Sequence, residues 1–250
     1  PTANLVLTGE NDVTVKSLDT SDADITALVV DTTDYTGTFT ITGGSPAFDG
    51  DSPTDDTTTN LTFVNSAKKG VDEDDDEIFL ASSIDDNGTP MDFSDDTVNY
   101  NTGVGEPAPY AGVSSGALTD IDTTGHDGVI SLGVISQVNS DDFTLDTGET
   151  GQLYACLGEA LDDGTETPTL NAAGVWTFDG EGGGRAGQGA NNLDLEMKAA
   201  NLGAGTLVLN DVDVTVTGDI DFTGLDTLTV SGSTTINVAA GATLKLTVAQ

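Results

Sequence analysis

Apolar and polar residues alternate in short runs along much of the chain, and Gly or Asp closes most of the runs. A period of two puts successive side chains on opposite faces of a strand. Thr, Val and Ile within the runs favour strands, whereas Gly and Asp favour turns. The pattern predicts an all-β protein. In the first 48 residues the expected strands are NLVLTG, DVTVKSL, ITALVVD and GTFTITGG.

The alternation is most regular in the last sixty or so residues. Six runs follow each other about every 6–9 residues: TLVLND, VTVTGD, DFTGLD, TLTVSG, TTINVA and TLKLTV. Short, even spacing is typical of a β-solenoid, in which each coil stacks on the next. Hairpins of a β-sandwich give a longer spacing of about 8–12 residues. We therefore predict a β-solenoid, similar to a parallel β-helix, for residues 193–250.

The remainder of the chain has less even strand spacing and long acidic loops such as DGDSPTDDTTTN. We expect residues 1–180 to form a β-rich, sandwich-like domain. Residues 181–192 are rich in Gly, which is typical of a flexible linker, and we place the domain boundary there. The predicted fold is all-β, with an N-terminal sandwich-like region followed by a C-terminal solenoid.

For one apolar segment the sequence pattern is compatible with either a helix or a strand. In GQLYACLGEAL, Leu153, Leu157 and Leu161 share one face of a helix, but Gly158 interrupts the run and a strand fits equally well. Cys156 within it is the only cysteine, so no intramolecular disulfide can form, and we expect a buried structural thiol. Trp176 is expected in the core. No run of about 18 apolar residues exists, so we expect no membrane insertion.

Acidic residues dominate the charge and narrow the choice of partners. Lys and Arg number 6 against 43 Asp and Glu, which gives a formal charge of −37. Nucleic acids and anionic lipids require basic patches, so we exclude both as partners. Asp outnumbers Glu about four to one and gathers in Gly-rich turns, which favours specific ion loops over a general adaptation to high salt. Oxygen-rich turns suit Ca²⁺, and we expect it as the bound cofactor.

The segment TDIDTTGHDGVI is the best single candidate for an ion loop. Asp120, Asp122 and Thr124, followed by Gly, match the first half of a calcium loop. The closing Glu is missing, and Asp127 is the expected substitute. His126, the only histidine, lies in this turn, where we expect it to be solvent-exposed rather than a catalytic base.

A second candidate is the densest acidic block, VDEDDDE, in which Asp72, Asp74 and Asp76 supply the oxygens. It is not an EF-hand, because Glu77 occupies the position where the sharp turn requires Gly. Two interpretations remain open: a hard-oxygen cluster that binds Ca²⁺, or a solvated acidic loop between two strands.

A third candidate carries a resemblance to a known family. Gly224, Asp226 and Leu228 fit half of the RTX nonapeptide. The stretch GLDTLTVSGSTTINVAAGATLKLTVAQ resembles the β-solenoid portions of large secreted bacterial proteins, such as RTX-type surface-layer proteins and related adhesins. The resemblance implies export without an N-terminal signal, and Ca²⁺ in turns between solenoid strands that drives folding and lattice assembly. Gly224 and Asp226 are the only residues to which the resemblance assigns a role in such a turn.

No enzymatic activity is expected, and we assign no catalytic or cofactor-binding residues. With 43 acids, any carboxylate pair can be proposed, so no pair is informative. We expect an extracellular structural protein that self-assembles into a surface layer, sheath or filament, with Ca²⁺ bridging Asp-rich turns. Its expected partners are copies of itself and cell-surface polysaccharide. The alternative is a virion or phage structural protein, such as a capsid decoration or fibre component.

Overall fold

The computed structural model describes residues 2–19, 25–42, 48–49, 60–65, 77–80, 82–85, 97–100, 111–114, 118–126, 128–136, 138, 142–148, 151–158, 167–181 and 191–247. Every regular element in these ranges is a β-strand, so the all-β prediction is confirmed. The described residues include no apolar helix of membrane-spanning length.

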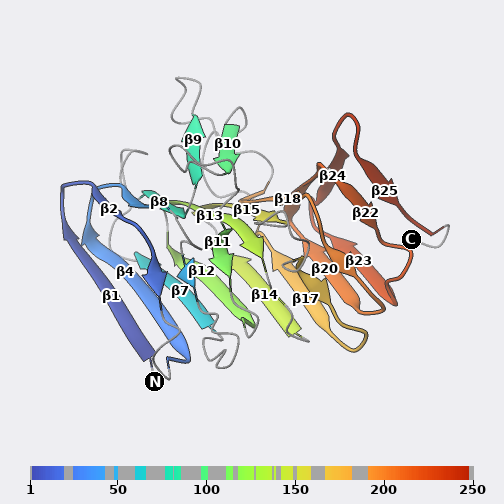
Figure 1. Ribbon diagram of the computed structural model, residues 1–250, viewed down its shortest axis with the longest axis horizontal. Helices are drawn as coiled ribbons and strands as arrows, with labels where there is room; N and C mark the ends of the chain where they lie inside the picture. The colour runs from blue at the N-terminus through green and yellow to red at the C-terminus, as the bar shows by residue number, and fades with distance from the viewer. Residues whose placement is uncertain are drawn as a thin grey trace.

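Two long parallel sheets run through the molecule. Sheet A contains, in spatial and chain order, β1 (Thr2–Gly9), β4 (Ala27–Tyr35), β7 (Asn60–Asn65), β12 (Asp120–His126), β14 (Asp142–Thr147), β17 (Val175–Asp179), β20 (Thr206–Asn210) and β23 (Thr227–Ser231). Sheet B contains β2 (Val13–Val15), β5 (Phe39–Ile41), β8 (Glu77–Leu80), β13 (Val129–Ser136), β15 (Gln152–Leu157), β18 (Leu193–Met197), β21 (Val212–Val216) and β24 (Thr235–Val238). Figure 1 shows the strands of sheet A side by side from blue to orange.

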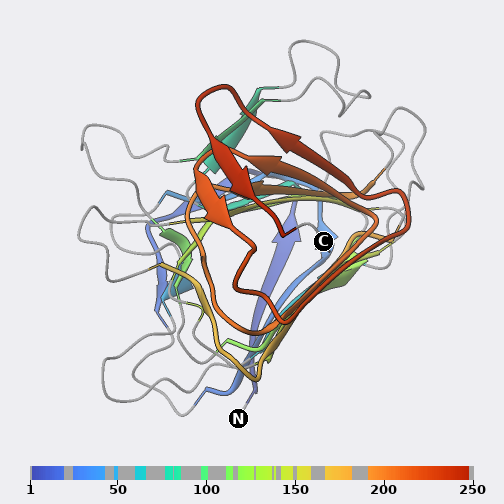
Figure 2. The ribbon, with the colours of Figure 1, turned by 90° about the vertical axis from the view of Figure 1, so that its right-hand side faces the viewer.

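Short strands form a third side of the stack. They are β3 (Leu18–Asp19), β6 (Phe48–Asp49), β11 (Ala111–Ser114), β16 (Thr169–Leu170), β19 (Asn201–Leu202), β22 (Asp219–Asp221) and β25 (Thr243–Lys245). The first three of them join sheet B because β11 also pairs with the end of β13. The chain passes from sheet A to sheet B to this side, and returns to sheet A one strand further along. The view in Figure 2 shows the resulting three-sided coil from the C-terminal end. The architecture is therefore β-helix-like.

The stack includes the N-terminal part of the chain, where we expected a sandwich. The strands of sheets A and B within residues 1–180 pair in parallel, for example β1 with β4 and β5 with β8. The antiparallel hairpin of β9 (Ser82–Asp85) and β10 (Thr97–Tyr100) is the exception among the described strands. The structure thus replaces the expected sandwich with further parallel coils. Alternation predicts which face a residue occupies, but it does not reveal the direction of the neighbouring strand.

Both sheets also continue past the Gly-rich stretch that we predicted as a linker. β17 pairs with β20 in sheet A, and β15 pairs with β18 in sheet B. Residues 182–190 lie outside the described residues. The described strands before and after this stretch belong to the same two sheets.

The core lies inside the coil and is built from inward-facing columns of apolar residues. In sheet A one such column runs through Leu145, Phe178 and Leu209, all of them buried. Trp176 and Phe178 both pack edge-on against Phe143, with ring centroids 5.8 and 5.9 Å apart. Aromatic pairs of this kind add to the stabilisation from buried area. The predicted core position of Trp176 is confirmed.

The ambiguous segment around Cys156 is a strand, β15, and each of its six residues is buried. Leu153 and Leu157 face the coil interior, whereas Cys156 faces outward beneath Tyr100 of the β9–β10 hairpin. A strand covered on both faces loses its polar alternation, and this explains why the sequence pattern also fits a helix. The expected burial of Cys156 is confirmed.

Candidate functional site

The best sequence-predicted ion loop lies on a strand. Asp120, Asp122 and Thr124 belong to β12, and the strand is irregular between Asp122 and Gly125. At this point the Oδ1 atom of Asp122 accepts hydrogen bonds from the backbone N–H (2.9 Å) and the hydroxyl (2.6 Å) of Thr124. Thr124 therefore donates to Asp122 instead of standing beside it as an oxygen ligand. The motif produces a local side-chain turn within a strand.

Other predicted site residues do not join this group. Asp72, Asp74, Asp76 and Asp127 lie outside the described residues. Asp226 is exposed and precedes β23, so that β14, β17 and β20 separate it from β12. The structure brings Asp120 and Asp122 together and leaves Asp226 apart.

His126 corrects a prediction. Only 2% of its surface is exposed, although we expected a solvent-exposed turn residue. His126 is the last residue of β12, and its Nδ1 atom accepts a hydrogen bond from the N–H of Gly128 at 3.1 Å. A sequence turn motif does not reveal this burial, because it depends on residues distant in the sequence that pack around the strand end.

The strand register adds acids that sequence reasoning missed. Asp122 is in register with Asp146 on β14, and Asp146 is in register with Asp179 on β17. We call these three residues the acid column. Neighbouring parallel strands lie about 4.8 Å apart, so like charges are stacked on the outer face of sheet A. The shared position of Asp146 in FTLDT and Asp179 in WTFDG, four residues after the start of each strand, was the available sequence signal.

Asp146 experiences the strongest electrostatic effect in the column. Its carboxylate is half-buried, and desolvation, followed by the charges of Asp179, Asp120, Asp122 and Glu181, raises its pKa to about 6. Among the described residues no donor is hydrogen-bonded to this carboxylate, whereas Asp120 accepts from the Asn60 amide at 3.3 Å. Burial raises the pKa of Asp120 as well. The acid column is therefore a place where a proton or a cation relieves repulsion.

The same column becomes neutral further along sheet A. Asp179 is followed in register by Asn210 on β20 and Ser231 on β23. The Asn210 amide donates to Asp179 Oδ1 at 2.9 Å, and the Ser231 hydroxyl donates to Asn210 Oδ1 at 2.8 Å. We call Asn210 and Ser231 the neutral segment. In the neutral segment each side chain donates a hydrogen bond to the acceptor oxygen of the preceding side chain in the column.

The acid column presents carboxylate oxygens only. Asp oxygens are preferred ligands of Ca²⁺, and the Asp146 carboxylate has unused acceptor capacity. A closed metal centre is a different arrangement. Within the described ranges, no three His, Cys, Asp or Glu side chains converge in a way that could enclose a metal ion.

The two ends of the stack expose residues that are core residues elsewhere. Val230 follows the buried Leu209 in its inward column but is 48% exposed, and Val238 follows the buried Val216 and is also 48% exposed. At the other end, Ala3 and Leu5 are only partly buried, although their partners on β4 are buried. Within the described residues no strand covers the outer edge of β1 or β23. Figure 2 looks onto the C-terminal coil and shows its open face.

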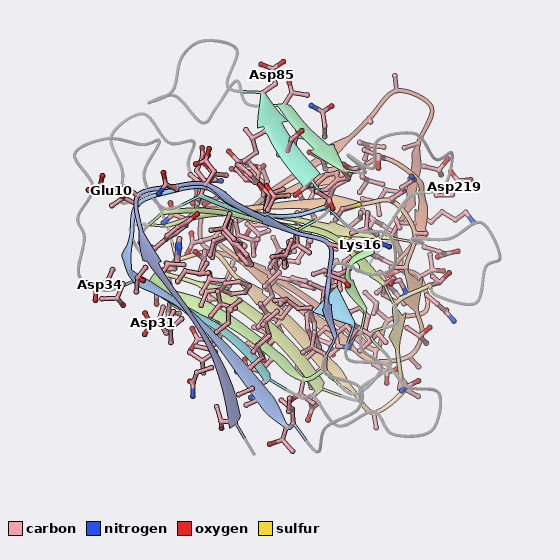
Figure 3. All side chains as sticks on the ribbon, turned by 60° about the vertical axis from the view of Figure 1, so that its left-hand side comes forward. Glu10, Lys16, Asp31, Asp34, Asp85 and Asp219 are labelled. Atoms are coloured by element: carbon pink, nitrogen blue, oxygen red, sulfur yellow. The ribbon has the colours of Figure 1, made fainter. Side chains whose placement is uncertain are left out.

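Most charged side chains labelled in Figure 3 lie around the outside of the coil, including Glu10, Asp31 and Asp34 near the N-terminal edge. Asp31 accepts a hydrogen bond from the N–H of Thr33, and hydrogen bonds from Thr33 hold the pKa of this carboxyl below its usual value. Such isolated, solvated acids contrast with the stacked acids of the acid column.

Comparison of the chain with protein-family models, with curated proteins and with solved structures finds no match.

Proposed function

We propose that this chain is an extracellular structural protein that self-assembles end to end through its coils into a filament, sheath or layer. The observation that supports the proposal is the parallel stack itself, because each coil pairs only with its neighbours and the same pairing can continue from one copy to the next. The first and last described coils keep the apolar inward pattern of the interior ones, and Val230 and Val238 are half-exposed.

The outer edges of the two parallel sheets favour pairing with the parallel strands of another copy of this chain. The outer strands β1 and β23 present unpaired backbone groups, which readily pair with another strand. A second copy offers an opposite end with the same three-sided coil, so pairing can occur in both sheets at once. The partner is therefore a copy of the same chain, and cell-surface polysaccharide is the proposed surface to which the assembly attaches.

Calcium has a defined place in this proposal. A formal charge of −37 opposes both folding and association of copies. Ca²⁺ bridging between neighbouring carboxylates, with Asp122, Asp146 and Asp179 as the proposed ligands on sheet A, lowers this repulsion. An ion that is bound by the folded state alone stabilises that state.

Sedimentation velocity of the purified chain at several concentrations tests the end-to-end assembly. We expect large species that grow with concentration, and we expect Val230→Asp to abolish them. Val175→Asp is the matched control, because Val175 is 40% exposed on β17 of the same sheet but faces outward, away from the ends. A wild-type chain that stays monomeric with and without Ca²⁺ contradicts the proposal.

Thermal unfolding with Ca²⁺ and with a chelator tests the role of the ion. At a Ca²⁺ concentration of 100 times Kd, the expected gain in the free energy of unfolding is about 2.7 kcal/mol. Asp146→Asn should reduce this gain, whereas Asp219→Asn, which changes an exposed acid on β22, should leave it intact. Equal stability with and without Ca²⁺ would rule out the bridging role.

A further inference from the structure

A cavity of about 240 Å³ lies between the β9–β10 hairpin and the outer face of sheet B. Strand β10 contributes Val98, Asn99 and Tyr100, sheet B contributes Val134, Cys156 and Glu196, and Lys198 follows the end of β18. Figure 1 shows the hairpin projecting from the stack, so that this region is separate from the acid column of sheet A. The cavity brings together residues that are up to about a hundred positions apart in the sequence.

The floor of the cavity is apolar and chemically inert. Val134 and Cys156 are buried, and Tyr100 packs against both. Burial, with a further effect from Glu196, raises the pKa of the Cys156 thiol far above its usual value. The thiol therefore remains protonated and is neither a nucleophile nor a metal ligand. The Cys156 thiol contributes a weakly polar surface to the floor of the cavity.

The rim of the cavity carries hydrogen-bonding groups of mixed type. Glu196 is held in place by the Thr217 hydroxyl, which donates to Oε1 at 2.6 Å, and its other oxygen is an acceptor. Lys198 is exposed and supplies an ammonium donor, and Asn99 supplies both a donor and an acceptor. Burial raises the pKa of the Tyr100 phenol well above its usual value, so the phenol stays protonated.

We infer that this cavity binds one neutral sugar unit of a polysaccharide. Sugar hydroxyls both donate and accept, which suits a rim that mixes Glu, Asn, Lys and a phenol, while the apolar face of a sugar ring suits the Tyr100, Val98 and Val134 surface. The volume lies just below the range of about 300–1,000 Å³ for drug-sized ligands, which is appropriate for a single small ring.

Charge and polarity disfavour other classes of ligand. An anionic ligand is repelled by the overall charge of −37. Asp194 and Glu196 also place negative charge near the cavity, where both raise the pKa of Tyr100 further. A wholly apolar ligand would remove water from Glu196 and Lys198 without replacing their hydrogen bonds. The inference develops the polysaccharide partner named in the proposed function, and it does not depend on end-to-end assembly.

Saturation-transfer difference NMR with small glycosides tests the inference. The probes are the methyl glycosides of glucose, galactose and N-acetylglucosamine, with glucuronate as an anionic probe and cyclohexanol as an apolar one. We expect saturation transfer to at least one neutral glycoside and little to the other two probes. Glu196→Gln and Tyr100→Phe, which change single polar groups with little change in shape, should each weaken the affinity about tenfold.

Two further variants make the result decisive. Asn99→Trp places a large ring at the exposed rim and should abolish the signal, whereas Asp219→Asn on the third side of the coil should leave it unchanged. Circular dichroism melting checks that each variant is folded. No transfer to any neutral glycoside, an undiminished signal in Asn99→Trp, or equal binding of cyclohexanol would overturn the inference.

The experiment is carried out in chelator and repeated with the Val230→Asp variant of the full chain. These conditions remove the proposed calcium bridging and the proposed end contact, while the cavity residues are unchanged. Sugar binding by a monomeric chain then supports the cavity inference even where assembly fails. Assembly without sugar binding overturns the cavity inference and leaves the proposed function standing.

Discussion

The acid column and the neutral segment occupy one continuous outward position on sheet A, but their side chains differ in charge and in hydrogen bonding. Asp122, Asp146 and Asp179 place three carboxylates on successive strands, and Asp146 finds no hydrogen-bond donor among the described residues. Asn210 and Ser231 continue the position with side chains that donate to the preceding one. The neutral segment pairs its polar groups within the stack, whereas the Asp146 carboxylate has no donor there among the described residues.

The two regions also differ in the length of chain between coils. Asn210 and Ser231, which are in register, are 21 residues apart, whereas the register partners Asp146 and Asp179 of the acid column are 33 residues apart. The corner after β20 is compact: Asp211 adopts a φ of 52°, and its Oδ1 atom accepts a hydrogen bond from the N–H of Ser233 at 2.7 Å. Short corners give the even sequence spacing of the C-terminal coils, and long excursions conceal it elsewhere.

The largest expected effect comes from converting the neutral segment into acid. Asn210→Asp removes the amide that donates to Asp179 and puts a fourth carboxylate in the column. We expect a loss of about 2 kcal/mol in the free energy of unfolding at pH 7, from one lost hydrogen bond to a charged group and added repulsion. Urea unfolding measures it. Asn237→Asp on β24 is the control, because its register partner is Thr215; an equal loss in both variants would mean that net charge alone matters.

The opposite change, Asp146→Asn, should stabilise the chain in the absence of Ca²⁺. The amide removes a charge that is disfavoured first by burial and then by neighbouring acids, and it can donate to a neighbouring carboxylate. Because the residue is half-exposed, solvent screening limits the expected gain to about 1 kcal/mol at pH 7. Asp219→Asn provides the baseline for removing an exposed acid. A destabilised Asp146→Asn in chelator would show that the column is not under electrostatic stress.

The pH dependence of stability should differ between wild type and Asp146→Asn. The pKa of Asp146 is raised from 3.8 to about 6 in the folded state, so the folded chain binds this proton more tightly than the unfolded chain. The resulting stabilisation is fully present below about pH 4 and is lost as the pH rises through 6. We expect wild type to lose about 1 kcal/mol more than the variant between pH 4 and pH 7, after allowance for screening. Parallel curves from urea unfolding at each pH would refute this assignment.

The smallest effect is expected at the exposed end of the neutral segment. Ser231→Ala removes the hydroxyl that donates to Asn210, but both groups are reached by water. The free energy of unfolding should change by about 0.5 kcal/mol or less. A loss comparable to that of Asn210→Asp would mean that the hydrogen-bonded ladder itself, rather than its lack of charge, stabilises this region.

Much of the local structure could be predicted from residue patterns. The runs TLVLND and TLTVSG correspond to β20 and β23, and the core position of Trp176 follows from its place in an alternating run. The candidate sites were harder to predict. Asp122 was found from its motif, but its partners Asp146 and Asp179 come from separate coils, and no sequence motif links them. The cavity beside Cys156 depends on the hairpin over sheet B, which the helix-like pattern of GQLYACLGEAL does not indicate.

By itself, the sequence determined that this protein is all-β, strongly acidic and free of intramolecular disulfides, because composition and a two-residue period act locally. Only the tertiary structure decided which acids stand next to each other, that His126 is buried, and that the strands from β1 to β17 in sheets A and B are parallel. Pairing between strands up to 60 residues apart depends on where each coil closes. That closure is set by packing inside the coil, which no single segment of the chain records.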